Sequence, residues 1–378
     1  MKILLTLLIS TIFIKNSFAL ETKAKQALLF DQETKTIIFE KNADDLMSPS
    51  SMSKIMTIYL LFKKIKEGDV NLDDEFRVSK KAWKKGGSRM FLNLNSLVTV
   101  EDLIRGIIVQ SGNDACIVLA EGISGSEEEF VNEMNLLAEE IGLKDSTFKN
   151  STGWPDPDHL MTTRDLLTLA ERTIQDFPEY YHYYAEREFE YNKIKQLNRN
   201  PLIFSDLNGD GLKTGHTSLG GYGLVASVEK NNRRLILILN GLNSNKQRRK
   251  ESERLIKLGF NQFKNINIIN MNTVIDDIPV WGGKEKLIGI YSKEKINITV
   301  PKRLKRNLKF SIKYKTPIIA PIKKDQKVAE FIIKKKNNEI LKKYDLFSNK
   351  EVPKLNFFGK VFQNLKYLVF GEASLLQK

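Results

Sequence analysis

The chain has 378 residues, a formal net charge of +14 and 41% hydrophobic residues. This length suits about two domains of roughly 100–200 residues each, and a mean hydropathy of −0.32 excludes a protein with many membrane spans. A single cysteine, Cys116, excludes an internal disulfide. The three histidines lie far apart and form no close metal-ligand pattern, so we expect neither a metal nor another cofactor.

Residues 1–19 have the pattern of a signal peptide. Lys2 precedes an apolar or weakly polar run over residues 3–14, and Ser17-Phe18-Ala19 resembles an export cleavage site. The alternative is an N-terminal anchor helix, but a membrane span needs about 20 residues. We expect cleavage after Ala19 and a location at the periplasmic face of the cytoplasmic membrane.

Residues 20–268 combine strand patterns at both ends with helix patterns between them. Two strands within 26–41 predict a hairpin, and a second strand pair is predicted over 222–241. Apolar residues at helical spacing predict helices from near Ser50 or Ser51 to Glu67, and over 100–122, 127–142 and 163–175. This order predicts an α/β domain whose two ends share one sheet.

Residues 269–352 change to a period of two, interrupted by prolines, which predicts a small β-sandwich-like domain. The charge also changes: residues 271–353 have 20 Lys/Arg and 9 Asp/Glu, and residues 354–378 add a net +3, so residues 1–270 are neutral. Because the protein is expected to be exported, we expect no nucleic acid partner; anionic lipid head groups or wall polymers suit this basic region. The alternative is a lysine-rich solvated surface.

The tail, residues 353–378, predicts an amphipathic helix. Its apolar residues recur at helical spacing, and its lysines 354, 360 and 366 lie off that stripe. The stripe consists of Phe357, Phe358, Val361, Phe362, Leu365, Leu368 and Val369. We expect residues 354–371 to lie in a membrane interface with the apolar face buried. The alternative is a helix docked on the β-domain.

Ser51-Met52-Ser53-Lys54 places a serine three residues before a lysine. On a helix these positions share a face, so Lys54 can reach the Ser51 hydroxyl and accept its proton if its pKa is lowered. The spacing alone is weak, because it recurs at Ser146, Ser227 and Ser292.

Two further motifs distinguish Ser51 from the other three serines. Ser111-Gly112-Asn113 ends an apolar run, and Lys213-Thr214-Gly215 stands just before a predicted strand. Only Ser51 lies upstream of both motifs, at intervals of 60 and 102 residues.

Three motifs in this order resemble the penicillin-binding proteins and serine β-lactamases. The residues in and around the motifs resemble the low-molecular-mass D-Ala-D-Ala carboxypeptidases more closely, at Ser111 to Cys116, Gly211 to Thr217, and Gly221-Tyr222. The resemblance covers about residues 25–265, and the basic β-domain and the tail also resemble that family. It implies a β-lactamase/transpeptidase-like fold, in which helices flank an antiparallel sheet. It also implies an enzyme that acts on peptidoglycan stem peptides and is inhibited covalently by β-lactams.

The same resemblance implies a role for each motif residue. Ser51 attacks the carbonyl between two D-alanines, and Lys54 accepts its proton. Ser111 relays a proton to the leaving amine, Asn113 holds Lys54 and the substrate, and Lys213 supplies a positive field. The backbone N–H groups of Ser51 and His216 are implied to bind the oxyanion. Thr214, in the Lys-Thr-Gly motif that ends at Gly215, is implied to bind the terminal carboxylate of the substrate.

Three other features carry less certain expectations. Arg248 and Arg199 match family arginines that suit a carboxylate, with a solvated surface arginine as the alternative for each. Cys116 lies either near the cleft or in the core. Thr152 stands where relatives often have His, which leaves the substrate contacts of its loop open.

Several alternative functions remain. A serine β-lactamase of the common class needs a Glu-x-x-Leu-Asn setting for deacylation, which is absent from the sequence. A D,D-endopeptidase of the same branch usually lacks a C-terminal module, unlike this chain. The non-enzymatic alternative is a wall-binding scaffold.

Overall fold

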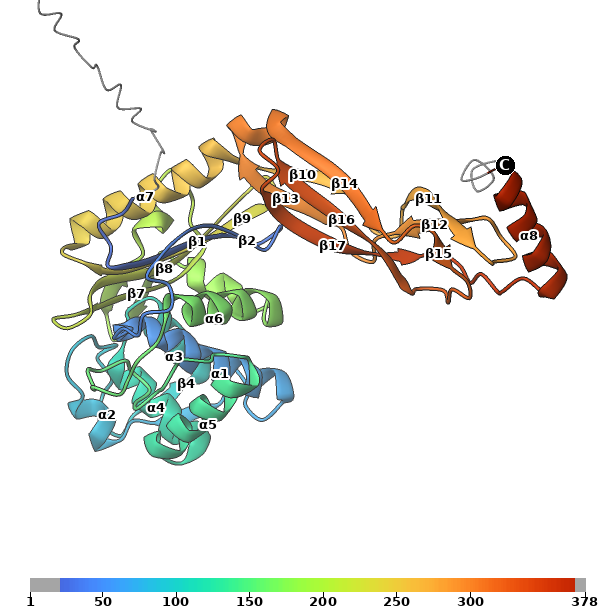
Figure 1. Cartoon of the computed structure of the whole chain (residues 1–378). Coiled ribbons are helices and arrows are strands. Elements are labelled where there is room, and N and C mark those ends of the chain that lie inside the picture. Colours follow the sequence, from blue (N-terminus) through green and yellow to red (C-terminus); the bar gives the residue numbers. More distant parts are fainter. Residues whose placement is uncertain (1–20, 371–378) are drawn as a thin grey trace, which may run out of the picture.

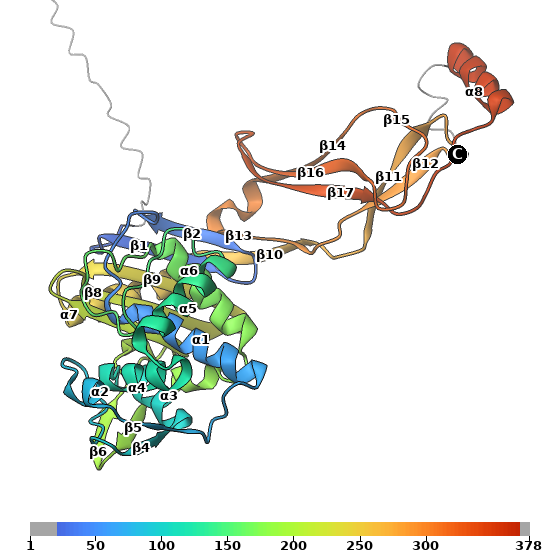
Figure 2. The ribbon, with the colours of Figure 1, turned by 90° about the horizontal axis from the view of Figure 1, so that it is seen from below.

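The computed structural model describes residues 21–370, so the expected signal peptide lies outside the described residues. An N-terminal domain of helices and one large sheet is followed by a β-domain and a final helix (Figures 1 and 2). The β-domain extends away from the N-terminal domain, and the final helix lies at its far end (Figure 1). This architecture confirms the expected fold class.

A five-stranded antiparallel sheet runs through the N-terminal domain in the order β2-β1-β9-β8-β7. Its strands are β1 (Gln26–Asp31), β2 (Thr36–Lys41), β7 (Gly211–Thr217), β8 (Gly221–Lys230) and β9 (Arg233–Leu242). Strand β1 pairs with β9 over its whole length. The two ends of this domain therefore share one sheet, and β7 is left at an edge.

Helices cover both faces of this sheet (Figure 2). Leu235, Leu237 and Leu239 of β9 belong to the core that includes residues of α7 (Asn245–Gln262). Ile236 and Ile238 belong to the larger core formed with the other helices. Because successive strand residues point to opposite faces, an unbroken apolar run is what a strand covered on both sides requires.

The remaining long helices lie on the side of the sheet opposite α7 and surround α1 (Figures 1 and 2). Ile55, Met56 and Phe62 of α1 are fully buried among them. The helical elements of this group, which include the short η1 and α2, are η1 (Ser50–Ser53), α1 (Lys54–Glu67), α2 (Lys80–Lys84), α3 (Val100–Ile108), α4 (Asn113–Ser124), α5 (Glu127–Glu140) and α6 (Thr163–Asp176). The smaller elements are β3 (Glu75–Arg77), β4 (Leu97–Thr99), η2 (Tyr181–Ala185), β5 (Glu188–Tyr191), β6 (Ile194–Leu197) and η3 (Pro201–Phe204).

The helical pattern expected over 100–122 is two helices in the structure. Helix α3 ends at Ile108 and α4 begins at Asn113, with Ser111 between them at a φ of 60°. The apolar spacing continues through the break because both helices bury residues in the same core. Periodicity alone therefore does not reveal the interruption.

The β-domain contains a two-stranded and a six-stranded sheet around its own core. Strand β10 (Phe263–Ile269) pairs with β13 (Ile296–Pro301), so the boundary expected between residues 268 and 269 falls inside β10. The six-stranded sheet has the order β14-β16-β17-β12-β11-β15. Its strands are β11 (Val274–Trp281), β12 (Leu287–Tyr291), β14 (Leu308–Tyr314), β15 (Ile318–Ile319), β16 (Lys327–Lys335) and β17 (Ile340–Ser348), with η4 (Lys302–Asn307) after β13.

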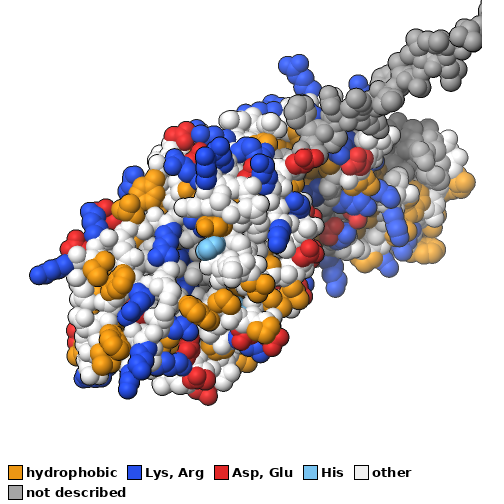
Figure 3. Space-filling view, turned by 90° about the vertical axis from the view of Figure 1, so that its left-hand side faces the viewer, with side chains coloured by type: hydrophobic (Ala, Val, Ile, Leu, Met, Phe, Trp, Pro, Cys, Tyr) orange, Lys and Arg blue, Asp and Glu red, His pale blue; other side chains and the backbone are white. Residues whose placement is uncertain are grey.

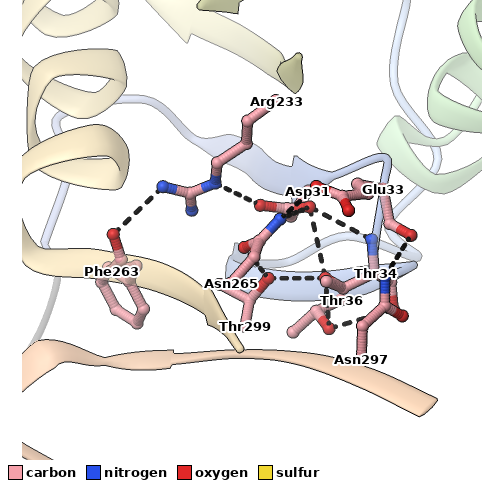
Figure 4. A network of polar contacts seen from close by, with 9 residues as sticks. All are labelled: Asp31, Glu33, Thr34, Thr36, Arg233, Phe263, Asn265, Asn297 and Thr299. Atoms are coloured by element: carbon pink, nitrogen blue, oxygen red, sulfur yellow. Dashed lines mark hydrogen bonds and ion pairs between the residues drawn. The ribbon is translucent and has the colours of Figure 1, made fainter. Parts of the chain in front are cut away.

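A polar network joins the two domains where the β1–β2 hairpin meets β10 and β13 (Figure 4). Asp31 is fully buried and its carboxylate accepts hydrogen bonds from Arg233 at 2.6 Å and Asn265 at 3.1 Å. The hydroxyls of Thr34 and Thr299 lie 2.5 Å apart. These contacts fix the β-domain to the hairpin side of the sheet.

Helix α8 (Phe357–Phe370) ends the described chain and leaves large apolar side chains exposed. Phe358 and Leu368 are each 80% exposed. Gln363 faces the other way, since its Oε1 accepts a hydrogen bond from the backbone of Gly282 at 3.0 Å. Within residues 21–370, no helix combines the length and apolar character needed to cross a bilayer.

Candidate active site

Ser51 and Lys54 stand at the junction of η1 and α1. The side chains share one face, and Lys54 Nζ lies 3.0 Å from Ser51 Oγ. The tight first turn is held by Met52 N donating to Pro49 O at 3.1 Å. The spacing seen in the sequence therefore brings the two groups into direct contact.

Lys54 is fully buried and has three polar partners. Besides Ser51, Nζ contacts Asn113 Oδ1 at 2.7 Å and the backbone carbonyl oxygen of Thr152. Burial, together with the nearby charges of Arg199 and Lys85, lowers the pKa of Lys54 to about 8. At pH 7 about a tenth of a group with this pKa is a neutral amine.

The carbonyl of Thr152 is a contact that the sequence did not reveal. The loop from 150 to 154 approaches η1 so closely that a Cβ on Gly153 would lie 2.0 Å from Ser50 O. Gly153 also has a φ of 71°, which favours glycine. Because every residue has a backbone carbonyl, the residue type at position 152 does not reveal this contact. The only signal in the sequence is the neighbouring Gly153, whose position accepts no other residue.

Strand β7 brings the third motif to the same place. Lys213, Thr214 and Gly215 are buried, and a Cβ on Gly215 would lie 2.8 Å from Pro49 O. Burial lowers the pKa of Lys213 well below its usual value, and the charges of Lys54 and Arg199 lower it further. The side chain of His216 is exposed, and its ring lies against that of Tyr222 in a tilted arrangement with the centroids 3.9 Å apart.

Ser111 and Asn113 come from the break between α3 and α4. Asn113 is held in position because its Nδ2 donates to Gly86 O at 2.9 Å while its Oδ1 faces Lys54. Ser111 is 1% exposed, and no described residue forms a hydrogen bond with its hydroxyl. The left-handed backbone at Ser111 is the kind of local strain that surrounding packing must hold in place.

The two predicted arginines occupy different places. Arg248 of α7 is buried behind β7, where it donates to Gly215 O at 3.4 Å and Gly223 O at 3.3 Å. The charge of Arg199 lowers the pKa of both Lys54 and Lys213, and its guanidinium donates to Ser88 Oγ at 2.6 Å. The charge of Arg248 also lowers the pKa of Lys213. Arg248 therefore contacts the backbone of the sheet, and both arginines lie within electrostatic reach of Lys213.

Cys116 is both buried and close to the site. It has no exposure in α4, and burial raises the pKa of its thiol to about 12. The charges of Lys54 and Lys213 oppose that rise, which places both within electrostatic reach. A thiol with this pKa stays protonated and behaves as a small apolar core residue.

Positive side chains gather on the face of the N-terminal domain that lies at the left of Figure 1, and acidic side chains stay toward its rim (Figure 3). Lys85 belongs to the mouth of the site and lies 4.9 Å over the ring of Trp154. Trp154 is 44% exposed. The entrance is therefore suited to an anionic substrate.

Comparisons with known proteins agree with this arrangement. Residues 14–244 match the family described as D-alanyl-D-alanine carboxypeptidase, and residues 263–354 match the penicillin-binding protein 5, C-terminal domain. D-alanyl-D-alanine carboxypeptidase DacC of Escherichia coli (strain K12) is 37% identical over 347 residues, covering 90% of this chain and 86% of that protein.

Solved structures show the same similarity. Penicillin binding protein 5 from Haemophilus influenzae has a TM-score of 0.80 and 34% identity, covering 88% of this chain and 98% of that one. Penicillin-binding protein D2 from Listeria monocytogenes in its ampicillin-bound form has a TM-score of 0.59 and 27% identity, covering 64% and 98%.

Proposed function

The chain belongs to the D-alanyl-D-alanine carboxypeptidase family, and on that premise we propose that it removes the terminal D-Ala from peptidoglycan pentapeptide stems through an acyl-enzyme on Ser51. One observation carries the serine mechanism: the buried Lys54 amine contacts the Ser51 hydroxyl at 3.0 Å and has a pKa lowered to about 8. Such an amine is neutral often enough near pH 7 to act as a base.

The partners of Lys54 orient its lone pair. Asn113 Oδ1 and the carbonyl of Thr152 can only accept hydrogen bonds. In a neutral amine they take the two N–H groups, so the lone pair faces the Ser51 hydroxyl. The proton then moves from Ser51 to Lys54 as Oγ attacks the carbonyl carbon between the two D-alanines.

The other residues act on the tetrahedral intermediate and the leaving group. Edge strand β7 presents the backbone N–H of His216, which with that of Ser51 stabilises the oxyanion. The hydroxyl of Ser111 relays the proton taken up by Lys54 to the departing D-Ala amine, so that Lys54 and Ser111 both return to their starting protonation states. Thr214 and Arg199 bind its carboxylate, and water then hydrolyses the acyl-enzyme.

A β-lactam carries a strained amide and a carboxylate that fit the same groups. We infer that β-lactams acylate Ser51 and leave slowly; binding of a β-lactam to this fold is supported by the relative solved in its ampicillin-bound form. The Glu-x-x-Leu-Asn setting that favours fast deacylation is absent from the sequence. This favours inhibition over β-lactamase turnover.

The test combines product release with labelling. The protein should release free D-Ala from a soluble pentapeptide and be labelled by fluorescent penicillin at Ser51. Ser51→Ala should abolish both, whereas Ser292→Ala, which removes a serine with the same spacing to a lysine in the β-domain, should abolish neither. Labelling that persists in Ser51→Ala would identify a different nucleophile.

The same assays separate the alternative activities. Rapid turnover of penicillin without D-Ala release would indicate a β-lactamase. Cleavage of cross-linked peptide dimers in preference to pentapeptides would indicate an endopeptidase. Neither activity with an intact fold would indicate a scaffold.

The location is also part of the proposal. The sequence of residues 1–19 supports export, and the exposed apolar residues of α8 support peripheral attachment to a membrane surface. An exported enzyme held at that surface would meet its peptidoglycan substrate at the periplasmic face.

A further inference from the structure

A cluster of cations that form no ion pair with any acid among residues 21–370 lies where the β-domain joins the N-terminal domain. We call it the junction basic surface: Lys264, Lys302, Arg303, Lys305, Arg306, Lys309 and Lys334. Between Glu294 and Asp325 the sequence has ten Lys/Arg and no acid. The nearby acids are already engaged, since Glu33 pairs with Lys295 and Glu339 pairs with Lys335.

The fold holds these like charges together at an energetic cost. Lys309 of β14 lies directly opposite Lys334 of β16, and like charges opposite each other destabilise a sheet. Contact with Lys305 lowers the pKa of Lys264, and the charges of Lys305 and Lys302 add to this effect. An anion from outside the chain would relieve this repulsion.

The junction basic surface lies at the opposite end of the β-domain from α8. Pro301, the residue before η4, pairs with Phe263 directly after α7, whereas α8 contacts Gly282 beyond β11. Figures 1 and 2 show the same separation. A membrane that contacts the apolar face of α8 would therefore lie away from these cations.

We propose that the junction basic surface binds the carboxylates of the peptidoglycan polymer while one of its stem peptides occupies the cleft. This inference rests on the proposed function, because it assigns a second contact with the same substrate. Most of the cations are lysines, which act as flexible point charges and suit repeated, irregularly placed carboxylates. Two contacts with one polymer increase its residence on the enzyme without changing the chemistry.

The test compares two full-chain variants with equal charge changes in the same domain. The first is Lys302→Glu, Lys305→Glu and Arg306→Glu. The control is Lys284→Glu, Lys323→Glu and Lys324→Glu, three exposed lysines at the α8 end of the β-domain with no described ion pair. Binding to purified peptidoglycan is measured by co-sedimentation, with and without prior hydrofluoric acid treatment to remove phosphodiester-linked polymers.

The first variant should bind peptidoglycan about tenfold more weakly than the unaltered chain, as expected for the loss of several surface cations, and the control should bind nearly normally. D-Ala release from insoluble peptidoglycan should fall in the first variant, with unchanged kcat/KM on soluble pentapeptide. Equal weakening in both variants would overturn the proposal.

Two other results would also overturn it in favour of a different anion. Binding lost after hydrofluoric acid treatment would indicate a phosphate polymer, and a specific loss of binding to anionic phospholipid vesicles would indicate the membrane. Failure of the proposed function is distinguishable, because the unaltered chain would then release no D-Ala from soluble pentapeptide whatever its binding to peptidoglycan.

Discussion

At the scale of single residues, the cleft contains two buried lysines whose charges repel each other. Burial lowers the pKa of both, and the charge of Lys54 lowers the pKa of Lys213 further. Lys54 Nζ has acceptors at Asn113 and Thr152, whereas no described residue forms a hydrogen bond with the side chain of Lys213. Lys213 is thus open to a substrate anion, which would in turn favour its charged form.

The pKa of Lys54 predicts the pH dependence of acylation. Because the proposed mechanism uses the neutral amine as the base and its pKa is about 8, acylation by penicillin should rise with pH through about 8 and level off above it. Asn113→Asp adds a carboxylate 2.7 Å from Nζ, which favours the charged form and raises the pKa by about one unit or more. The pH–rate profile should therefore shift to higher pH, which makes acylation roughly tenfold slower at pH 7.

Stopped-flow acylation with a chromogenic β-lactam measures both profiles. Asn113→Ala serves as the control, because it removes the acceptor for Lys54 without adding a charge. A profile for Asn113→Asp that is slower at every pH by one constant factor would contradict an effect on the Lys54 pKa.

Gly153 gives a prediction about local fit. Gly153→Ala places a Cβ 2.0 Å from Ser50 O at a positive φ, so the loop must move away from η1. Gly142→Ala has a similar φ of 84° with nothing within 4 Å of the added Cβ. Both variants should lose about 1–2 kcal/mol from the backbone effect.

Only Gly153→Ala should also lose acylation, by about tenfold or more, because Thr152 O leaves Lys54. Urea unfolding and penicillin labelling measure the two effects separately. Equal labelling of the two variants would show that the Thr152 contact is dispensable.

At the scale of elements, α8 has two faces with different surroundings. Gln363 contacts the β-domain through Gly282, whereas Leu365 is 56% exposed on the apolar stripe. The domain thus holds the polar side of the helix and leaves the apolar side outward. This orientation suits a surface that buries apolar side chains.

Leu365→Glu should weaken binding to phospholipid vesicles by about tenfold or more, because a buried leucine contributes about 1.5–3 kcal/mol. Gln363→Glu introduces the same residue on the opposite side and keeps the acceptor for Gly282, so it should bind nearly normally. Vesicle co-sedimentation of both proteins decides the matter. Unchanged binding of Leu365→Glu would favour docking of α8 on protein instead.

At the scale of the whole molecule, the buried network around Asp31 couples the two domains. Asp31 is fully buried, and its partner Arg233 is only 12% exposed at the side chain. The same arginine donates to Phe263 O at 3.0 Å, the first residue of β10. One ion pair therefore stabilises both the sheet and the start of the β-domain.

Asp31→Asn keeps the shape but leaves Arg233 without its counter-charge, so we expect a loss of about 3 kcal/mol or more. Glu33→Gln, in the same hairpin but exposed, should cost less than about 1 kcal/mol. Urea unfolding measures both. Penicillin labelling of the folded Asp31→Asn protein should stay normal. Reduced labelling of the folded protein would contradict a purely structural role.

The sequence by itself determined the fold class, the family and most of the motif residues. Local patterns sufficed, because strand and helix periods depend on neighbouring residues and because Ser51 and Lys54 are three positions apart on one turn. The order of the three motifs along the chain then identified the family without any knowledge of interatomic distances. The interruption between α3 and α4 escaped the same reasoning because the apolar spacing continues across it.

The tertiary structure decided which groups meet across the chain. The carbonyl of Thr152 contacts Lys54 although a backbone acceptor has no signature in the sequence. Arg199 and Arg248 both match family arginines in sequence, and folding brings both charges within electrostatic reach of Lys213 while Arg248 also donates to the backbone of the sheet. The lowered pKa values and the junction basic surface likewise arise from burial and from charges brought together by folding, which chain order alone does not specify.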